Sequence, residues 1–246
     1  MTFSQLVRRL GRRAGLEISR YRPFAARRMQ LLRVKKISTV IDVGANVGGY
    51  GAELRAFGYT GQIISLEPLA SAFAELSRRA GPDRNWECLN VAAGERDADA
   101  IINVASESVS SSLLPIRAEH RLGAPATVYT AQEHIRLRRL DSLDLAITSP
   151  AMLKVDTQGY EAHVIDGAPV ILTTVAILEC ELSIAHVYEG QPSFRSMIDR
   201  ASDLGFDLID IDPFFRERAT GRVMSMDAIF VREGAPIGLP GGLPAS

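Results

Sequence analysis

A short apolar run that ends in a glycine-rich turn constrains the fold of this chain most strongly. Residues 39–43 read TVIDV, and GANVGG follows at residues 44–49. β-Branched residues favour a strand, and glycine lets the backbone turn sharply and come close to a ligand. Tyr50, Leu54 and Phe57 then recur at helical spacing. The segment therefore predicts a strand, a ligand-binding turn and a helix in succession.

The same alternation of strand and helix continues along the chain. Further apolar, strand-like runs are 63–66, 86–91, 152–155, 175–181, 206–211 and 228–231. Amphipathic helix patterns separate most of them, which favours a doubly wound, mostly parallel sheet covered on both faces. Residues 94–140 interrupt this rhythm with two strand-like runs and a serine-rich loop. We interpret this segment as an insertion built on a β-hairpin.

The charge distribution divides the chain into a basic arm, residues 1–36, and a domain, residues 37–232. The arm contains 11 Lys or Arg and one acid, Glu17, and its pattern predicts helices over 3–16 and 24–34. Such an arm can pack on its own domain or contact an anionic membrane surface. Its few aromatic residues do not favour nucleic acid. Residues 233–246 are rich in Gly and Pro and predict a disordered tail.

Nothing in the sequence predicts a membrane span or a secreted protein. No run approaches the roughly 20 apolar residues that cross a bilayer, and no apolar segment follows the basic N-terminus as in a signal peptide. The two cysteines, Cys88 and Cys180, cannot form a disulfide framework. We therefore expect a cytoplasmic protein, with the arm as a possible contact to the inner face of the membrane.

Two acids near the glycine turn indicate the kind of ligand. Asp42 directly precedes the turn, and an acid there opposes a phosphate but suits the cationic groups of S-adenosylmethionine. Asn46 stands where a dinucleotide-binding GxGxxG loop would need glycine. Glu67 ends the second predicted strand, 25 residues after Asp42. An acid so placed accepts hydrogen bonds from ribose hydroxyls.

Further acids end the two strands on the other side of the turn. Asp156 follows the strand at 152–155, and Glu179 and Glu181 end the strand at 175–181. Ligands of open α/β sheets bind at the carboxyl ends of the strands. Asp156 and Glu181 are therefore candidate bases, or together candidate ligands of a hard cation such as Mg²⁺. His186, five residues beyond Glu181, is a third candidate base.

In its ordered set of motifs the chain resembles the FkbM-type S-adenosylmethionine-dependent methyltransferases. The resemblance covers about residues 38–232. It rests on IDVGANVGGYG, ISLEP, LNVAAG, SVSSSL, RLDSL, LKVDTQGYEAHVIDGA, ECELS with VYEGQPSF, and LGFDLIDIDPFF with TGRVMSMDAIFVR. It implies a class I methyltransferase fold, which is Rossmann-like, with a seven-stranded sheet and an antiparallel last strand. It also implies methylation of hydroxyls on natural products, glycolipids and saccharides.

The resemblance and the strand positions together define the predicted sites. The predicted cofactor residues are Asp42, Gly44, Ala45, Asn46, Gly48, Tyr50, Glu67, Pro68, Asn90, Ala92 and Asp156. The predicted acceptor residues are Ser110, Ser112, Tyr188 and Asp227. Gln158 stands where many relatives have Glu, so no role that requires a charge can be carried over to it.

Two other classes of protein remain open at this point. A non-catalytic S-adenosylmethionine-binding partner protein would keep the turn but would not need acids at the ends of both later strands. An NAD-dependent oxidoreductase would need a glycine at position 46. The sequence also leaves open whether oxygen, nitrogen or a carboxyl group accepts the methyl group.

Overall fold

The computed structural model describes residues 24–232, and a seven-stranded sheet forms its centre. The helix expected over 3–16 and the tail beyond 232 lie outside the described residues. The strands are β1 (Thr39–Val43), β2 (Gln62–Leu66), β3 (Trp86–Leu89), β7 (Ala151–Val155), β8 (Val175–Ser183), β9 (Phe206–Arg216) and β10 (Val223–Arg232).

The order of these strands confirms the predicted fold class. The sheet runs β3-β2-β1-β7-β8-β10-β9. Strands β3, β2, β1, β7 and β8 pair in parallel, whereas β10 is antiparallel to both β8 and β9. A mostly parallel sheet whose last strand in sequence is antiparallel is the class I methyltransferase arrangement. The order reverses beside β1, and the ligand site of such a sheet lies at this switch point.

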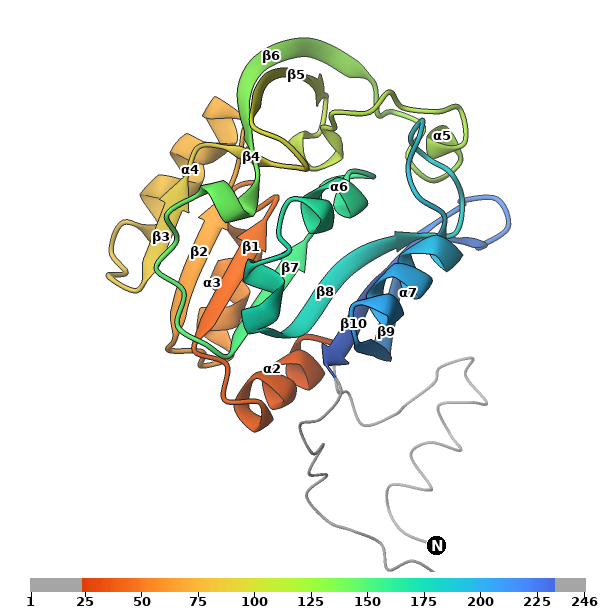
Figure 1. Cartoon of the computed structure of the whole chain (residues 1–246). Coiled ribbons are helices and arrows are strands. Elements are labelled where there is room, and N and C mark those ends of the chain that lie inside the picture. The colour runs from red at the N-terminus through yellow and green to blue at the C-terminus, as the bar shows by residue number, and fades with distance from the viewer. Residues whose placement is uncertain (1–23, 233–246) are drawn as a thin grey trace, which may run out of the picture.

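Helices cover both faces of the sheet, as Figure 1 shows. On one face lie α2 (Phe24–Val34), α3 (Gly49–Ala56) and α4 (Ala70–Ala80); on the other lie α6 (Glu161–Asp166), the 3-10 turn η3 (Ile171–Thr174) and α7 (Phe194–Asp203). Alternate strand residues point to opposite faces. Val40 therefore packs with Leu54 and Leu76 in one core layer, and Ile41 packs with Val164 in the other.

The insertion forms a second, smaller sheet, which confirms the predicted hairpin. Strands β5 (Ala98–Ala105) and β6 (Tyr129–Arg138) are antiparallel, and β4 (Ala92–Ala93) pairs with β6 in parallel. The remaining short elements are the 3-10 turns η1 (Ser108–Ser110) and η2 (Leu140–Ser142) and helix α5 (His120–Gly123). This sheet stands above the carboxyl ends of β1, β2 and β7 (Figure 1) and supplies one wall of the site described below.

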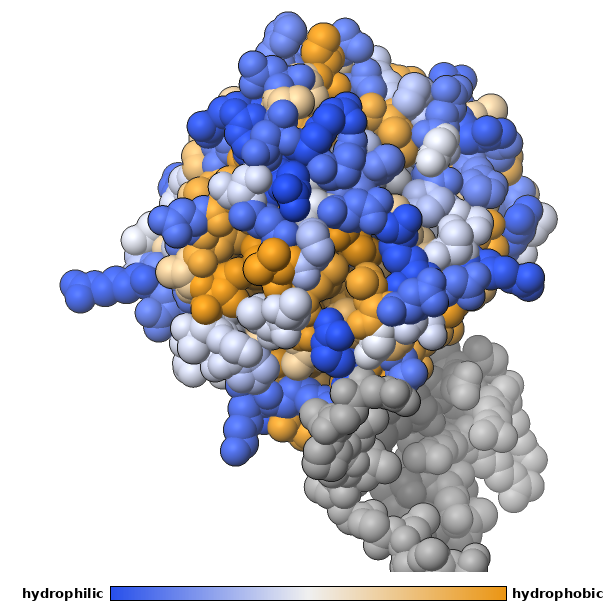
Figure 2. Space-filling view, viewed as in Figure 1, coloured by the Kyte–Doolittle hydropathy of each residue, from blue (hydrophilic) through white to orange (hydrophobic). Residues whose placement is uncertain are grey.

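The part of the basic arm that the structure describes is packed on the domain. Phe24, Met29 and Leu32 of α2 are buried in the same core layer as Leu54. Residues 24–232 contain no helix that is long and apolar enough to span a membrane. Figure 2 shows a largely hydrophilic surface, with apolar residues gathered in the middle of this face over the strands.

Candidate active site

The glycine turn after β1 brings two strand ends together at close range. Gly44 has φ +79°, and a Cβ atom there would lie 1.9 Å from the carbonyl oxygen of Asp156. The Asp156 N–H in turn donates to the carbonyl of Val43 at 3.0 Å. Glycine is required at position 44 because other residues rarely adopt this left-handed backbone conformation, and because no space remains there for a side chain. The turn thereby fixes the end of β7 against the end of β1.

Glu67 holds the loop from the end of β2. Its Oε2 accepts from the N–H of Asn46 at 2.8 Å, and its Oε1 accepts from the N–H of Leu69 at 2.9 Å. Each oxygen keeps a lone pair for another donor. Burial raises the pKa of Glu67 to about 7, although the two backbone donors oppose the rise. The carboxylate is thus fixed in place and still able to accept from two hydroxyl groups.

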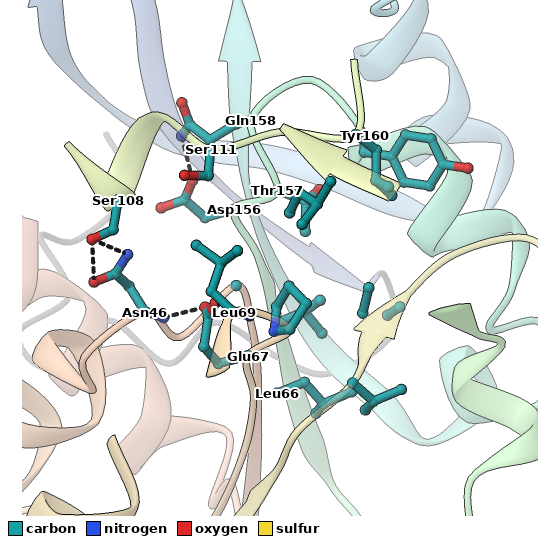
Figure 3. Close-up of a pocket in the computed structure, with 18 of the residues that line it drawn as sticks. Asn46, Leu66, Glu67, Leu69, Ser108, Ser111, Asp156, Thr157, Gln158 and Tyr160 are labelled. Carbon is teal, nitrogen blue, oxygen red and sulfur yellow. Dashed lines mark hydrogen bonds between the residues drawn. The ribbon is translucent and has the colours of Figure 1, made fainter. Parts of the chain in front are cut away.

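A pocket, here called the loop pocket, lies between the turn, Glu67 and the inserted sheet (Figure 3). Asn46 closes one side, because its Nδ2 donates to Ser108 Oγ at 3.0 Å. The apolar lining comes from Leu66, Leu69, Val91, Ala92, Ile102 and Leu113, and the polar lining includes Asn46, Glu67, Ser108, Ser111, Asp156, Thr157 and Gln158.

The loop pocket suits S-adenosylmethionine by its apolar and polar lining. An apolar slot with a carboxylate at its edge suits an adenine ring followed by a ribose. Gly44 also lines the pocket, beside the strand end that carries Asp156. Asn46 and Glu67 would hold the nucleoside part, and Asp156 would lie beside the charged sulfur.

A second cavity, here called the arm cleft, adjoins the loop pocket and is closed by helix α2. Both cavities are lined by Gly44, Asn46 and Asp156. The other carboxylates in the cleft are Glu53, Glu179, Asp212 and Asp227, and its aromatic residues are Phe24 and Tyr50. Burial, together with the charges of Asp156 and Glu179, raises the pKa of Asp227 to about 7.

Asp156 is the carboxylate at the junction of the two cavities. Lys154 Nζ lies 3.5 Å from its Oδ2, and the Gln158 side-chain amide donates to its Oδ1 at 2.8 Å. Burial lowers the pKa of Lys154, but the charges of Asp42 and Asp156 outweigh it and hold that pKa above its usual range. Asp156 therefore faces the cavities with a fixed orientation beside a permanent cation.

Glu181 lies behind Asp156 rather than in either cavity. The Gln158 side-chain amide donates to Glu181 Oε2 at 2.9 Å, and the Tyr188 hydroxyl donates to Gln158 Oε1 at 2.8 Å. Burial, with the charges of Asp156 and Glu161, raises the pKa of Glu181 well above its ordinary value. Glu181 is thus placed to support Asp156, not to meet an acceptor directly.

Asp42 is also turned away from the cavities. It is fully buried in β1, where it pairs in register with Lys154 of β7. Its Oδ1 lies 3.2 Å from Lys154 Nζ, and its Oδ2 accepts from the Ser65 hydroxyl at 3.2 Å. Asp42 therefore acts on the site through Lys154, which it shares with Asp156.

The remaining predicted residues are distributed as follows. Ala45, Tyr50 and Asp227 line the arm cleft, and Pro68 and Ala92 line the loop pocket. Asn90 braces the end of β2, because its amide donates to the carbonyls of Glu67 and Pro68, each at 2.9 Å. Gly48 packs beneath the loop, where a Cβ would lie 2.8 Å from Leu76 Cδ1.

Four further predicted residues lie outside both cavities, as Asp42, Gly48, Asn90 and Glu181 do. Ser110 and Ser112 are buried, and their neighbours Ser108 and Ser111 line the loop pocket in their place. Tyr188 is buried as a hydrogen-bond partner of Gln158. His186 borders a separate surface pocket with Arg117 and Glu119 and does not reach Asp156.

Sequence reasoning missed three kinds of contributor to the site. Gln158 connects the two acids, Arg28 of the arm closes the cleft, and Ile102 and Leu113 of the insertion form the apolar wall. A signal existed for Gln158, which follows Asp156 by two residues in a turn. No local sequence pattern indicates the roles of Arg28, Ile102 and Leu113.

The predicted Mg²⁺ site does not fit the donors that are present. In the described part of the chain, no group of three or more His, Cys, Asp or Glu residues is arranged to hold a metal ion. Asp156 and Glu181 both accept from the same Gln158 nitrogen, which lies where a bridging cation would have to bind.

Comparison with known proteins identifies the class that this fold and site define. A model of the methyltransferase FkbM domain matches residues 42–208. A similar protein, 2-O-methyltransferase NoeI of Sinorhizobium fredii, is 24% identical over 181 residues, which are 70% of this chain and 74% of that protein. The class is that of the S-adenosylmethionine-dependent methyltransferases.

The solved structures found are distant in sequence. A TehB-like methyltransferase of Corynebacterium glutamicum is 11% identical, with a TM-score of 0.45 over 94% of this chain and 96% of that one. Precorrin-6y C5,15-methyltransferase of Geobacter metallireducens is 12% identical, with a TM-score of 0.47 over 85% and 87%. The family model covers more than half of the chain, and the chain belongs to the FkbM methyltransferase family.

Proposed function

We propose that this protein transfers the methyl group of S-adenosylmethionine to a hydroxyl group of a sugar, a glycolipid or another natural product. The observation that carries the proposal is the position of Asp156, which lines both the loop pocket and the arm cleft. A carboxylate at that junction can receive a proton from a group in the cleft while that group faces the cofactor. The similar protein of Sinorhizobium fredii is named a 2-O-methyltransferase, which supports oxygen as the acceptor.

The chemistry divides between cofactor and protein. When bound, S-adenosylmethionine supplies a methyl group on a positively charged sulfur, and this sulfur is a good leaving group. The protein must orient the acceptor and take up the hydroxyl proton. Asp156 is held by Lys154 and Gln158 for the second task. Asp227 and Asp212 in the cleft can accept hydrogen bonds from neighbouring hydroxyl groups.

Two measurements test this proposal in sequence. Calorimetric titration with S-adenosylhomocysteine should give saturable binding, and titration with NAD should give none. Transfer of labelled methyl groups is then measured on hydroxylated glycosides and glycolipids, with amines and carboxylic acids as comparison acceptors. Methylation of only the amines or the acids would overturn oxygen as the acceptor. Binding without transfer to any acceptor would favour a non-catalytic partner protein.

Membrane contact through the arm is a separate proposal, and it concerns residues 1–23. Arg27 and Arg28 of α2 are already paired with Asp210 and Glu179 of the domain. Six arginines precede them: Arg8, Arg9, Arg12, Arg13, Arg20 and Arg22. We expect the full chain to float with anionic liposomes and a variant lacking residues 1–23 to stay behind. Equal flotation of the two proteins would contradict this proposal.

A further inference from the structure

A side-chain amide joins the two acids that the sequence suggested as metal ligands. Gln158 Nε2 lies 2.8 Å from Asp156 Oδ1 and 2.9 Å from Glu181 Oε2, so each of its two N–H groups has one carboxylate acceptor. Figure 3 shows Gln158 leaning over Asp156 at the edge of the loop pocket. The three side chains form one connected cluster, here called the amide clamp.

The orientation of this amide is determined by groups on its other side. The Tyr188 hydroxyl donates to Gln158 Oε1 at 2.8 Å, which leaves Nε2 to face the acids. The reverse orientation would turn the amide oxygen away from the Tyr188 hydroxyl and against the carboxyl oxygen of Asp156. The backbone is held as well, because Ser112 Oγ donates to the Gln158 carbonyl at 2.7 Å. Gln158 also has φ +55°, a left-handed backbone conformation that is uncommon for a residue with a side chain.

A cation between two carboxylates serves to bring them together and to offset their repulsion. The amide clamp does this with a neutral group, since two N–H dipoles replace the positive charge. A hard divalent ion needs six or more oxygen ligands. The clamp offers two carboxylates with a nitrogen between them, so such an ion would have to displace Gln158 from three hydrogen bonds.

We propose that Gln158 is a positioning residue that takes the place of a divalent cation, and that residue 158 decides whether this site binds metal. With glutamine, Asp156 is held at the junction of the cavities without metal. With glutamate, three carboxyl groups would converge on the same point and form a cation site. The role of Asp156 in transfer rests on the proposed function, but the metal-binding behaviour of residue 158 does not.

The test compares Mn²⁺ binding by the full-length wild type, Gln158→Glu and Gln132→Glu, measured by electron paramagnetic resonance. Gln132 is exposed on β6, so its substitution matches the charge change at a remote position. We expect one saturable Mn²⁺ site in Gln158→Glu and none in the other two proteins. A saturable site in the wild type that Asp156→Asn removes would overturn the proposal.

A second readout separates positioning from a merely structural role. Gln158 lines the loop pocket, so S-adenosylhomocysteine binding reports on the clamp. In the presence of EDTA we expect Gln158→Glu to bind this ligand about tenfold more weakly than the wild type, and Mn²⁺ to restore the affinity. EDTA should not change the wild type. If folded Gln158→Glu binds no Mn²⁺, or if EDTA weakens the wild type, the proposal is wrong. Failure to find an acceptor would affect only the proposed function.

Discussion

Arg28 and Glu179, which are 151 residues apart in sequence, form a buried ion pair with two hydrogen bonds. Arg28 Nε donates to Glu179 Oε2 at 2.6 Å, and an Nη group donates to Oε1 at 2.7 Å. Both side chains are almost completely buried, and the guanidinium also lies over the ring of Tyr50. The pair fastens the basic arm to the strand that ends at the site.

Removal of either partner should destabilise the protein strongly. Arg28→Met leaves the Glu179 carboxylate buried without its cation, and such a change costs about 3–5 kcal/mol. Arg27→Met is the matched control, because the side chain of Arg27 is 37% exposed and its ion pair with Asp210 is worth at most about 1 kcal/mol. Urea unfolding followed by circular dichroism measures both values.

The double variant tests whether the loss comes from the unpaired charge. Replacing a buried ion pair by apolar residues of similar size is often close to neutral. Arg28→Met with Glu179→Met should therefore recover most of the stability lost in Arg28→Met alone. If the two losses simply add, the unpaired charge is not the cause.

The loop pocket depends on the absence of a side chain at position 44. Gly44→Ala would place Cβ against the carbonyl of Asp156 in a left-handed backbone conformation. We expect a loss of about 1–3 kcal/mol in stability and of most S-adenosylhomocysteine binding. Gly49→Ala is the control, since a Cβ there meets no atom within 4 Å. Equal binding by the two variants in calorimetry would show that the close approach at Gly44 does not matter.

The fold was predictable because its signals are local. Apolar, β-branched runs and the glycine turn mark β1, and repetition of the strand–helix alternation defines a doubly wound sheet. The antiparallel β10 and the inserted hairpin were also predicted, the first from the family resemblance and the second from the broken rhythm of residues 94–140. Boundaries were less exact, as β9 and β10 extend well beyond the predicted 206–211 and 228–231.

The orientation of site residues was not predictable, because it depends on register between distant strands. Asp42 was expected to face the cofactor, but pairing of β1 with β7 brings Lys154 beside it and satisfies its charge inside the sheet. In the serine run, the turn η1 presents Ser108 and Ser111 rather than Ser110 and Ser112. Arg28 belongs by sequence to a basic arm, and only the tertiary fold supplies Glu179 as its partner.

Binding at the loop pocket should depend on pH through Glu67. Burial raises the pKa of this carboxyl to about 7. Ribose hydroxyls donate best to the ionised form, so ligand binding lowers this pKa and releases a proton. S-Adenosylhomocysteine affinity should therefore rise as pH increases through 7. Calorimetry in buffers of different ionisation enthalpy measures the proton release.

Substitution at Glu67 isolates its contribution. Glu67→Gln should flatten the part of the pH dependence near 7, whereas Glu75→Gln, at a half-buried position of α4 outside the loop pocket, should not. The stability of the ligand-free protein should depend on pH in the opposite direction. The raised pKa means that Glu67 still holds its proton in the folded protein between pH 4.5 and about 7, where the unfolded chain has released it. The unfolding free energy of the wild type should fall across this window relative to Glu67→Gln. An unchanged binding profile in Glu67→Gln would exclude Glu67 as its source.

Methyl transfer itself should depend on Asp156 more than on any other predicted base. Asp156→Asn keeps an oxygen that can accept from Gln158 but loses the charge that takes up a proton, so transfer to the acceptor should fall about 10²–10⁴-fold. S-Adenosylhomocysteine should still bind. Glu181→Gln should have a smaller effect, because Glu181 lies behind Asp156, and His186→Ala should have none, because His186 borders a different pocket.

Full turnover in both Asp156→Asn and Glu181→Gln would remove these acids from the mechanism. The base would then have to be sought among the carboxylates of the arm cleft, first at Asp227, whose pKa of about 7 suits proton transfer at neutral pH.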